Sequence, residues 1–340
     1  MVNRQIVLAE RPTGRIDAST TRLVEAERPV AGEGQALVRV GTLSIDPAMR
    51  GWMDDAPSYL PPIQIGEVIR SMGVGVVVES HTDHFAVGDV VSGITGWQEW
   101  VIAEGEHLFS VLPTGTGLDV PTVMNVLGMT ALTAYFGLLD VGAFAEGDVV
   151  VVSGAAGATG SVAGQLARAR GAAKVVGVAG GPDKCRYVVD RLGFDECLDY
   201  REPGLSKALR RSCPAGVDLY FDNVGGAVLD AALANLAMHA RVVACGSISG
   251  YNDKSGAGVR NLSALIGRRG RMEGFIVFDF AARYGEARAE LARLIQAGQL
   301  VHDEHLVDGL ENAPAALNML FDGANFGKTL VVVDPSVTLG

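Results

Sequence analysis

At residues 149–160 the chain reads VVVVSGAAGATG, and these twelve residues are the strongest indication of its fold. Four consecutive valines predict a strand that is buried on both faces. The small-residue turn leads into SVAGQLAR at 161–168, which we expect to be helical. A strand, a tight turn and a helix in this order place a diphosphate at the helix N-terminus, where free N–H groups and the helix dipole favour an anion. The segment therefore predicts a dinucleotide-binding domain.

The turn matches the dinucleotide fingerprint G-x-G-x-x-G except at its first position, where Ala155 stands. Gly157 lets the backbone approach the diphosphate, and Gly160 lets the helix pack closely on the strand. Ala158 and Thr159 lie between these glycines and are expected cofactor contacts. A glycine-rich turn with a purely structural role is the alternative, but the buried strand before it and the helix after it favour nucleotide binding.

The second strand of the nucleotide-binding pattern indicates which dinucleotide binds. An NAD site usually carries an acid at the end of this strand, about 20 residues beyond the turn, for the ribose 2′-hydroxyl. Here the strand ends Val178-Ala179-Gly180-Gly181 and Lys184 follows. A lysine can neutralise a 2′-phosphate, and small glycines leave room for it, so we predict NADPH. In the alternative interpretation, Asp183 is a late acid that selects NAD.

Length and composition are those of a globular enzyme with room for two domains. The chain has 340 residues, of which 48% are hydrophobic and 20% charged, with a formal net charge of -11. A nucleic-acid partner is not expected, because the only basic cluster, residues 268–271, reads as a solvated helix end. No signal peptide is apparent, and we expect no apolar run that approaches the ~20 residues needed to span a bilayer, so no membrane partner is predicted.

The four cysteines, Cys185, Cys197, Cys213 and Cys245, lack the C-x-x-C spacing of a structural zinc site. Scattered cysteines are typical of a reducing compartment, so we expect the protein in the cytoplasm.

The chain changes character near residue 124. Before it, short strands are expected at 35–40, 75–79, 89–93 and 97–102, separated by Gly, Pro and Asp, as in a small barrel or sandwich. After it, expected strands at 174–178, 217–221 and 241–245 alternate with helices at 183–192 and 228–238, and a last strand is expected at 328–333. This alternation predicts an α/β fold with a doubly wound parallel sheet.

Several further segments carry a family resemblance. They are LSIDPAMRG at 43–51, GMTALTAYFGL at 128–138, FDNVGG at 221–226, CGSISGYN at 245–252 and NFGK at 325–328. With them the chain, from about residue 30 to 334, resembles a zinc-independent medium-chain dehydrogenase/reductase of the leukotriene B4 12-hydroxydehydrogenase, prostaglandin reductase and curcumin reductase type.

The resemblance implies a β-rich GroES-like catalytic domain, residues 1–123 and 311–340, and a Rossmann NADP-binding domain, residues 124–310. It implies NADPH-dependent reduction of the C=C bond in α,β-unsaturated ketones or aldehydes, which are small-molecule substrates. It also implies a homodimer, in which a strand at 272–280 would pair across a two-fold axis.

By motif position, the resemblance assigns roles to individual residues. Lys184 should meet the 2′-phosphate, Tyr200 the adenosine end, and Asn223 the cofactor at the tip of its strand. The nicotinamide half should be lined by a loop and a strand, and Asn325 should also touch the cofactor. The loop is Cys245, Gly246, Ser247, Ile248, Ser249 and Tyr251, and the strand is Phe275, Ile276 and Val277.

The zinc ligands of the wider superfamily are missing. Ser44 and Asp46 stand near the position of the first Cys ligand, and Gly66-Glu67 lacks the preceding His of the usual Gly-His-Glu. Without thiolate and imidazole, we expect no catalytic metal.

Hydride transfer to the β-carbon of an enone leaves negative charge on the carbonyl oxygen, so a metal-free site needs a hydrogen-bond donor there. Tyr251 is the leading candidate and Tyr59 the second. The nicotinamide ribose hydroxyl is a competing donor, and Tyr251 in a packing role and Tyr59 as a loop anchor are the alternatives. Met49, Arg50, Trp52 and Met124 are expected to shape the substrate pocket, although a structural ion pair is the favoured interpretation of Arg50.

Two other functions stay open from the sequence. One is a zinc-free carbonyl reductase or alcohol dehydrogenase on the same fold, and the other is a non-catalytic NADPH-binding protein.

Overall fold

The computed structural model describes residues 2–105, 108–115, 117–253 and 258–339. The chain divides into two compact units. The first is Met1–Met124 together with Glu304–Gly340, and the second is Asn125–Asp303. The chain returns to the first unit at residue 304, whereas we expected this boundary at residue 311. The difference arises because the strand β14 (Glu304–Asp308) pairs with β15 (Lys328–Val332) in the sheet of the first unit.

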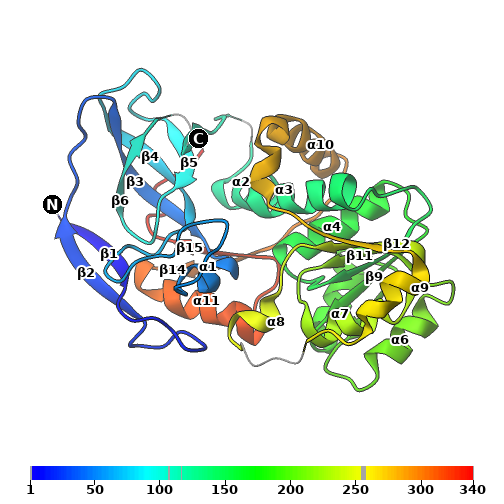
Figure 1. The fold of residues 1–340 in the computed structure, drawn as a ribbon. Helices are drawn as coiled ribbons and strands as arrows, with labels where there is room; N and C mark the ends of the chain where they lie inside the picture. The colour runs from blue at the N-terminus through cyan, green and yellow to red at the C-terminus, as the bar shows by residue number, and fades with distance from the viewer. Residues whose placement is uncertain (1, 106–107, 116, 254–257, 340) are drawn as a thin grey trace. The chain divides into compact units, whose positions relative to one another are not determined.

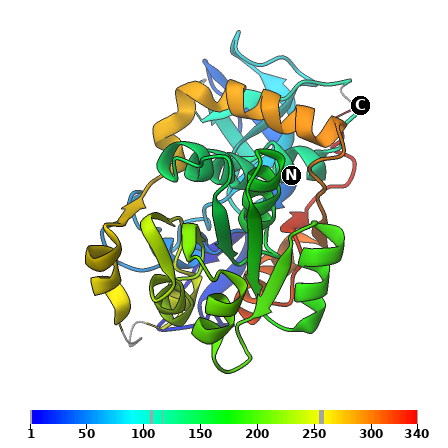
Figure 2. The same ribbon diagram turned by 90° about the vertical axis from the view of Figure 1, so that its right-hand side faces the viewer.

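The second unit is built on a six-stranded parallel sheet, shown in Figures 1 and 2. Its order is β10-β9-β8-β11-β12-β13, so the direction of winding reverses at β8. This is the doubly wound Rossmann arrangement predicted from the sequence, and ligands bind at such a reversal, beyond the carboxyl ends of the strands. The strands are β8 (Val149–Ser153), β9 (Lys174–Ala179), β10 (Glu196–Asp199), β11 (Val217–Asp222), β12 (Leu236–Ala244) and β13 (Arg271–Gly274).

The valines of β8 explain why this strand is central. Val150 and Val152 belong to the hydrophobic cluster on one face of the sheet, and Val151 belongs to the cluster on the other face. All three are fully buried, and burial of each valine stabilises the fold by about 1.5–3 kcal/mol.

Helices cover both faces of this sheet. One face packs on α3 (Met129–Phe136), α4 (Ala158–Ala169) and α10 (Tyr284–Gln296). The other packs on α6 (Leu205–Ser212) and α7 (Gly226–Leu233). The expected helix at 183–192 is two segments, α5 (Pro182–Arg186) and the π-helical turn η2 (Tyr187–Arg191).

Two predictions for this unit are wrong. The helix expected at 228–238 ends at Leu233, because the chain from Leu236 pairs with β11. The strand expected at 272–280, with its part at 275–277, ends at Gly274 and gives way to the 3-10 helix η4 (Val277–Arg283). The expected loop at 245–251 likewise contains a short helix, α8 (Ile248–Tyr251).

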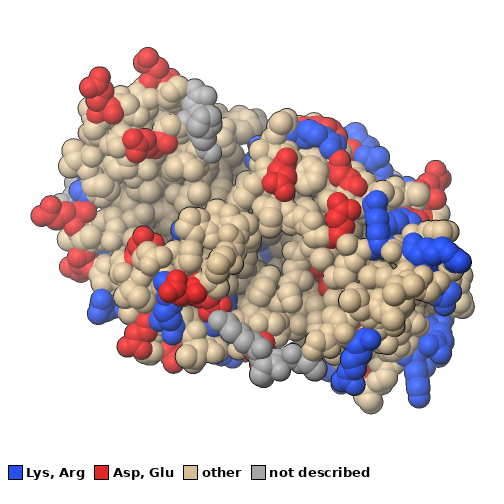
Figure 3. Space-filling model, viewed as in Figure 1, with Lys and Arg blue, Asp and Glu red and all other residues tan. Residues whose placement is uncertain are grey.

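Basic side chains gather over α6 and α9 (Ala264–Arg268) in Figure 3, where α6 carries Lys207, Arg210 and Arg211. Arg268 and Arg269 belong to the basic cluster at residues 268–271. They are exposed at the end of α9, as expected for a solvated helix end.

The first unit contains a seven-stranded mixed sheet and a separate antiparallel pair of strands. The larger sheet has the order β14-β15-β3-β4-β5-β7, with β6 also paired to β3, and its core includes the helices α1 (Ala48–Trp52) and α11 (Ala313–Asp322). The strands are β1 (Val2–Leu8), β2 (Thr21–Glu27), β3 (Gln35–Ser44), β4 (Met72–Ser80), β5 (Val90–Ile94), β6 (Trp100–Glu104) and β7 (Phe109–Val111), besides β14 and β15.

One apolar segment, Val120–Val141, has the length and the mean hydropathy (1.4) of a membrane span, which the sequence reasoning overlooked. It contains α2 (Val120–Val126), α3 and the π-helical turn η1 (Gly137–Val141). Because 61% of its most apolar 18-residue stretch is buried inside the protein, we interpret the segment as helix of the protein core.

Candidate cofactor and active site

The N-terminus of α4 is open to an anion. Gly157 is its N-cap residue, and within the described part of the chain no side chain caps the helix. The N–H groups of Ala158, Thr159 and Gly160 precede the first complete helical turn and have no acceptor within the helix. A β-carbon on Gly160 would stand 2.3 Å from the carbonyl oxygen of Gly154, so the turn closes this tightly only with glycine. The turn therefore fits a diphosphate.

A buried carboxylate organises the neighbouring strand end. Asp222, at the end of β11, is 2% exposed. Its Oδ1 accepts hydrogen bonds from Ser153 Oγ at 3.0 Å and from the Tyr220 hydroxyl at 2.8 Å. The same oxygen accepts from the backbone N–H groups of Val224 and Gly225, at 3.1 and 3.0 Å. Asp222 thus fixes the loop that follows β11, although the sequence reasoning assigned it no role.

Asn223 ties this loop to the end of β8. Its Nδ2 donates to the carbonyl oxygen of Ser153 at 2.7 Å, and its backbone N–H donates to Ser153 Oγ at 2.9 Å. The Asn223 side chain also lies against Gly154, at the start of the phosphate turn. The structure therefore brings Asn223 to the phosphate turn.

The segment 245–251 folds onto the same loop. The N–H groups of Cys245 and Gly246 donate to the carbonyl oxygen of Asp222 at 2.9 and 3.0 Å. Ser249 donates to the carbonyl oxygen of Val224 through its N–H at 3.1 Å and its hydroxyl at 2.6 Å. The ends of β8, β11 and β12 and the helix α8 form one hydrogen-bonded platform.

Tyr251 is held within this platform. Its phenol oxygen accepts a hydrogen bond from the N–H of Ser247 at 3.2 Å. Burial raises the pKa of Tyr251, while the Ser247 hydrogen bond opposes the rise. The phenol is therefore protonated at neutral pH and keeps its own O–H for donation. Burial likewise raises the pKa of Cys245 to about 12, so its thiol is neutral.

The two glycines that follow β9 are covered by the side chains of a tyrosine and an arginine. A β-carbon on Gly180 would stand 2.9 Å from the Tyr200 hydroxyl, and one on Gly181 would stand 3.3 Å from Arg201 Nη1. The N–H groups of Gly181 and Arg201 both donate to Asp199 Oδ1 at 2.9 Å. Tyr200 and Arg201 thus lie directly over the glycine pair.

Lys184 joins this cluster from α5. Burial lowers the pKa of Lys184, and the positive charge of Arg201 lowers it further. Two cations that repel one another in this way favour an anion between them. Asp183, the alternative acid, forms an exposed ion pair with Arg186 on the same helix. Sequence reasoning missed Arg201, which is the second residue after β10, because no strand was expected at 196–199.

The three residues expected at the nicotinamide half lie after β13. Phe275 contacts Gly137 and forms an edge-on ring pair with Phe280 at 6.3 Å. Ile276 and Val277 are partly buried, and the Val277 carbonyl oxygen accepts from the Tyr284 hydroxyl at 3.0 Å.

In the first unit, two of the expected pocket residues are buried in the interior. Met49 and Arg50 are both 0% exposed. Arg50 Nε donates to the carbonyl oxygen of Gly14 at 2.6 Å, and its Nη2 donates to that of Pro12 at 3.1 Å. Its Nη1 pairs with Asp54 at 2.9 Å, which confirms the structural ion pair. The charge of Arg50 is thus buried and paired, as the favoured interpretation of this residue expected.

The other expected residues of this unit differ in exposure. Tyr59 is 47% exposed, and its hydroxyl accepts from Trp52 Nε1 at 3.1 Å. The two rings pack edge-on at 6.2 Å, so Tyr59 anchors its loop on Trp52. Met124 is buried in an apolar cluster, and the buried Asn325 donates from Nδ2 to the carbonyl oxygen of Gly327 at 3.2 Å.

An ammonium group lies where the first zinc ligand would be expected. Lys328 Nζ donates to Asp46 Oδ1 at 2.8 Å and to the carbonyl oxygen of Ile45 at 2.9 Å. Ser44 Oγ donates to the other oxygen of Asp46. Across the described residues, no group of three or more His, Cys, Asp or Glu side chains has the arrangement of a metal site.

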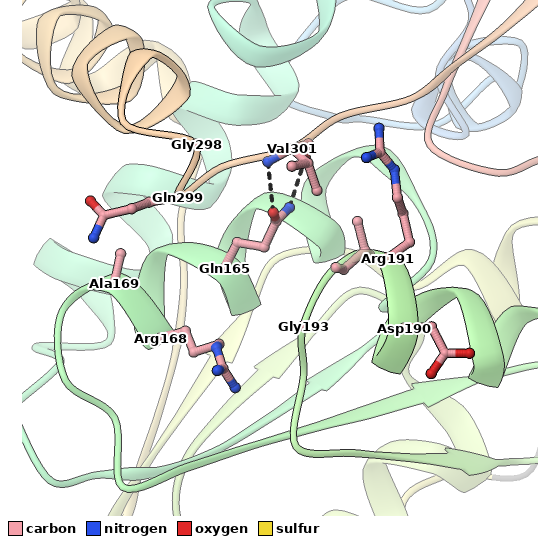
Figure 4. Close-up of a pocket in the computed structure, with 10 residues that line it drawn as sticks. Gln165, Arg168, Ala169, Asp190, Arg191, Gly193, Gly298, Gln299 and Val301 are labelled. Atoms are coloured by element: carbon pink, nitrogen blue, oxygen red, sulfur yellow. Dashed lines mark hydrogen bonds between the residues drawn. The ribbon is translucent and has the colours of Figure 1, made fainter.

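A surface cavity of about 330 Å³ lies elsewhere in the second unit, as Figure 4 shows. Gln165 at its wall exchanges two hydrogen bonds with the backbone of Val301, at 2.8 and 2.9 Å. Gln165 is eight residues along α4 from Gly157, a distance of about 12 Å. The cavity is therefore separate from the phosphate turn.

Two known protein families match the chain, each over a different part of it. A family described as the N-terminal domain of oxidoreductase matches residues 4–111, and one described as zinc-binding dehydrogenase matches residues 158–297. The NADPH-dependent curcumin reductase of Escherichia coli (strain K12) is 41% identical, with 97% of each chain covered. The NADP(+)-dependent 2-alkenal reductase of Nicotiana tabacum is 39% identical, again with 97% of each covered.

A solved structure of CurA from Vibrio vulnificus in complex with NADPH is also similar. It superposes with a TM-score of 0.92 at 42% identity, and the match covers 97% of this chain and 99% of that one. The chain therefore belongs to the medium-chain dehydrogenase/reductase family. Within that family it falls in the branch of the curcumin and prostaglandin reductases, as the sequence motifs predicted.

Proposed function

We propose that this protein is an NADPH-dependent reductase of the C=C bond in α,β-unsaturated ketones and aldehydes. The observation that carries the proposal is the pair of neighbouring cations beyond the end of β9, Lys184 and Arg201, of which Arg201 lies over Gly181. This pair fits a 2′-phosphate, and the relatives named above are NADP-dependent reductases of curcumin and 2-alkenals.

The cofactor is assigned along the carboxyl edge of the parallel sheet. Residues 157–160 receive the diphosphate, and Lys184, Arg201 and Tyr200 receive the adenosine 2′-phosphate end. Asn223, the segment 245–251 and residues 275–277 take the nicotinamide half. From the first unit, Asn325 is assigned to the cofactor by the family resemblance.

NADPH supplies the hydride when bound, and the protein must stabilise the negative charge that develops on the substrate carbonyl oxygen. Tyr251 suits this role, because its raised pKa keeps the phenol protonated and the Ser247 N–H holds its oxygen in place. The phenol donates a hydrogen bond to the carbonyl oxygen, and water or the phenol delivers the proton to the α-carbon.

The decisive experiment is product analysis with purified protein, NADPH and an enone panel of short alkenals, lipid enones and aryl enones. The proposal expects the saturated ketone or aldehyde. An allylic alcohol would indicate a carbonyl reductase, and tight NADPH binding without turnover on any enone would indicate a non-catalytic binding protein.

We also propose a cytoplasmic homodimer. The supporting feature is β13, an edge strand of the parallel sheet that is exposed along its whole length. Exposed apolar side chains lie on it and on the neighbouring helices, among them Met272, Leu262, Phe278 and Ile266, which is 83% exposed. An unprotected apolar edge favours pairing with a second copy across a two-fold axis. Four free thiols suit a reducing cytoplasm.

Light scattering coupled to gel filtration tests the dimer. Met272→Lys with Ile266→Lys should yield monomer, whereas Leu306→Lys, at an exposed apolar position on the edge strand β14, should leave the dimer intact. A wild-type monomer at micromolar concentration would overturn the proposal.

A further inference from the structure

Two free cysteines lie in sulfur contact beside the cation cluster. Cys197 on β10 donates its S–H to Cys185 Sγ on α5, with 3.2 Å between the sulfurs. Both residues are partly exposed at the edge of the hydrophobic core. A disulfide requires about 2.05 Å between sulfurs, so closing the pair takes a movement of about 1.2 Å.

The two thiols are not equivalent. Burial raises the pKa of both Cys185 and Cys197, and the nearby carboxylate of Asp199 adds to the rise. The S–H of Cys197 lowers the pKa of Cys185, because its hydrogen bond stabilises the Cys185 thiolate. Donating that bond has the opposite effect on Cys197, because it stabilises the protonated thiol, and the pKa of Cys197 is raised far more. Cys185 therefore ionises first and is the attacking sulfur, and Cys197 is the resolving one.

We propose that Cys185 and Cys197 are a reversible oxidation site, which hydrogen peroxide converts to an intramolecular disulfide. The Cys185 thiolate attacks one peroxide oxygen, so that an S–O bond forms, the O–O bond breaks and hydroxide leaves to become water. Cys197 then attacks the sulfur of the Cys185 sulfenic acid, an S–S bond forms, and the S–O bond breaks with release of a second water. Each sulfur loses one electron, and the peroxide gains two.

The bridge would act on the cofactor site, and this consequence rests on the proposed function. Cys185 is the neighbour of Lys184 on a five-residue helix. Cys197 belongs to β10, which four pairs of residues join to β9. Because β10 is held in the sheet by β9, closing the sulfur gap displaces Cys185 and with it Lys184 from the geometry it shares with Arg201. Oxidation therefore weakens the binding of the 2′-phosphate of NADPH.

The test begins with hydrogen peroxide and the reduced full-length protein. We expect loss of two of the four thiols, a tryptic peptide pair joined through Cys185 and Cys197, and full recovery with dithiothreitol. In Cys197→Ser, dimedone should trap a sulfenic acid on Cys185, whereas in Cys185→Ser it should trap none on Cys197. Cys213→Ala removes a buried thiol away from the pair and should oxidise like the wild type.

Nucleotide binding tests the coupling. The oxidised protein should bind NADPH about five- to tenfold more weakly, as expected when a charge-assisted hydrogen bond is stretched, and NADH within about twofold of the reduced protein. A bridge without any change in NADPH affinity would overturn the coupling. Retention of all four thiols, or linkage of any other pair, would overturn the oxidation site itself. The thiol count and the peptide map do not depend on enone reduction. Failure of the proposed function can therefore be distinguished from failure of the oxidation site.

Discussion

The phenol oxygen of Tyr251 accepts a hydrogen bond from the backbone N–H of Ser247, 3.2 Å away. This bond uses a lone pair of the oxygen and leaves the phenol proton available to a substrate. The same contact connects Tyr251 to the platform formed by the ends of β8, β11 and β12, so its position is set by the sheet.

Tyr251→Phe should lower kcat by about 10–100-fold, because one preorganised donor to the developing oxyanion is lost. The dissociation constant for NADPH should change less than twofold. Tyr135→Phe is the matched control: its hydroxyl contacts Glu286 and Glu290, and kcat should be unaffected. Unchanged turnover in Tyr251→Phe, measured in pre-steady-state experiments, would remove Tyr251 from the reaction.

Tyr59→Phe should leave kcat nearly unchanged. The substitution removes an acceptor for Trp52 Nε1 in an exposed loop, a loss of about 1 kcal/mol or less. Steady-state kinetics with the same enone give the comparison. A fall in kcat as large as that of Tyr251→Phe would make Tyr59 the donor instead.

Lys184→Ala and Arg201→Ala should each raise the KM for NADPH by about 10–100-fold, because each removes a charge-assisted hydrogen bond to the 2′-phosphate. The KM for NADH should stay within about twofold, since NADH lacks that phosphate. Arg186→Ala, which loses only the exposed ion pair with Asp183, is the control. Equal effects on both cofactors would contradict the assignment.

The preference for NADPH should decline at alkaline pH. Burial and the neighbouring Arg201 lower the pKa of Lys184 in the free protein, so Lys184 begins to lose its charge below the ordinary lysine range. A bound phosphate favours the charged form, so binding above that lowered pKa requires proton uptake and weakens as pH rises. The KM ratio of NADPH to NADH, followed from pH 7 upward, should increase in the wild type and stay flat in Lys184→Ala. A flat wild-type ratio would rule out this linkage.

Gly160→Ala should destabilise the protein by about 1–3 kcal/mol, because its β-carbon would stand 2.3 Å from a backbone oxygen. Gly157→Ala meets the same oxygen at 3.3 Å and should cost less stability, yet it should weaken NADPH binding by obstructing the diphosphate. Thermal unfolding and nucleotide titration separate the two effects. Equal loss of stability in both variants would contradict this description of the turn.

The sequence predicted the parts of the fold that local patterning determines. The valine run of β8 and the turn after it lie as expected, since continuous apolar character has few alternatives to a central buried strand. The helix at 228–238 was wrong beyond Leu233. There the alanine-rich sequence favours helix, but pairing of β12 with β11 and β13 overrides that preference.

The site was predicted less completely than the fold. Lys184 could be predicted as a phosphate ligand because the acid expected near it was missing. Arg201 could not, because it approaches the end of β9 only through the pairing of β10 with β9. Asp222 was overlooked, because a buried carboxylate that accepts four hydrogen bonds looks like any other acid in a sequence. For Arg50 the sequence favoured a structural ion pair but could not indicate its buried backbone acceptors, Gly14 and Pro12, because they lie far away in the chain.

The position of the transferred hydride in the product shows directly whether the protein reduces the C=C bond. Purified protein, NADPH deuterated at the transferred position and an aryl enone should give the saturated ketone with deuterium on the β-carbon. Deuterium on the carbonyl carbon, in an allylic alcohol, would show that the protein reduces the carbonyl group and not the C=C bond.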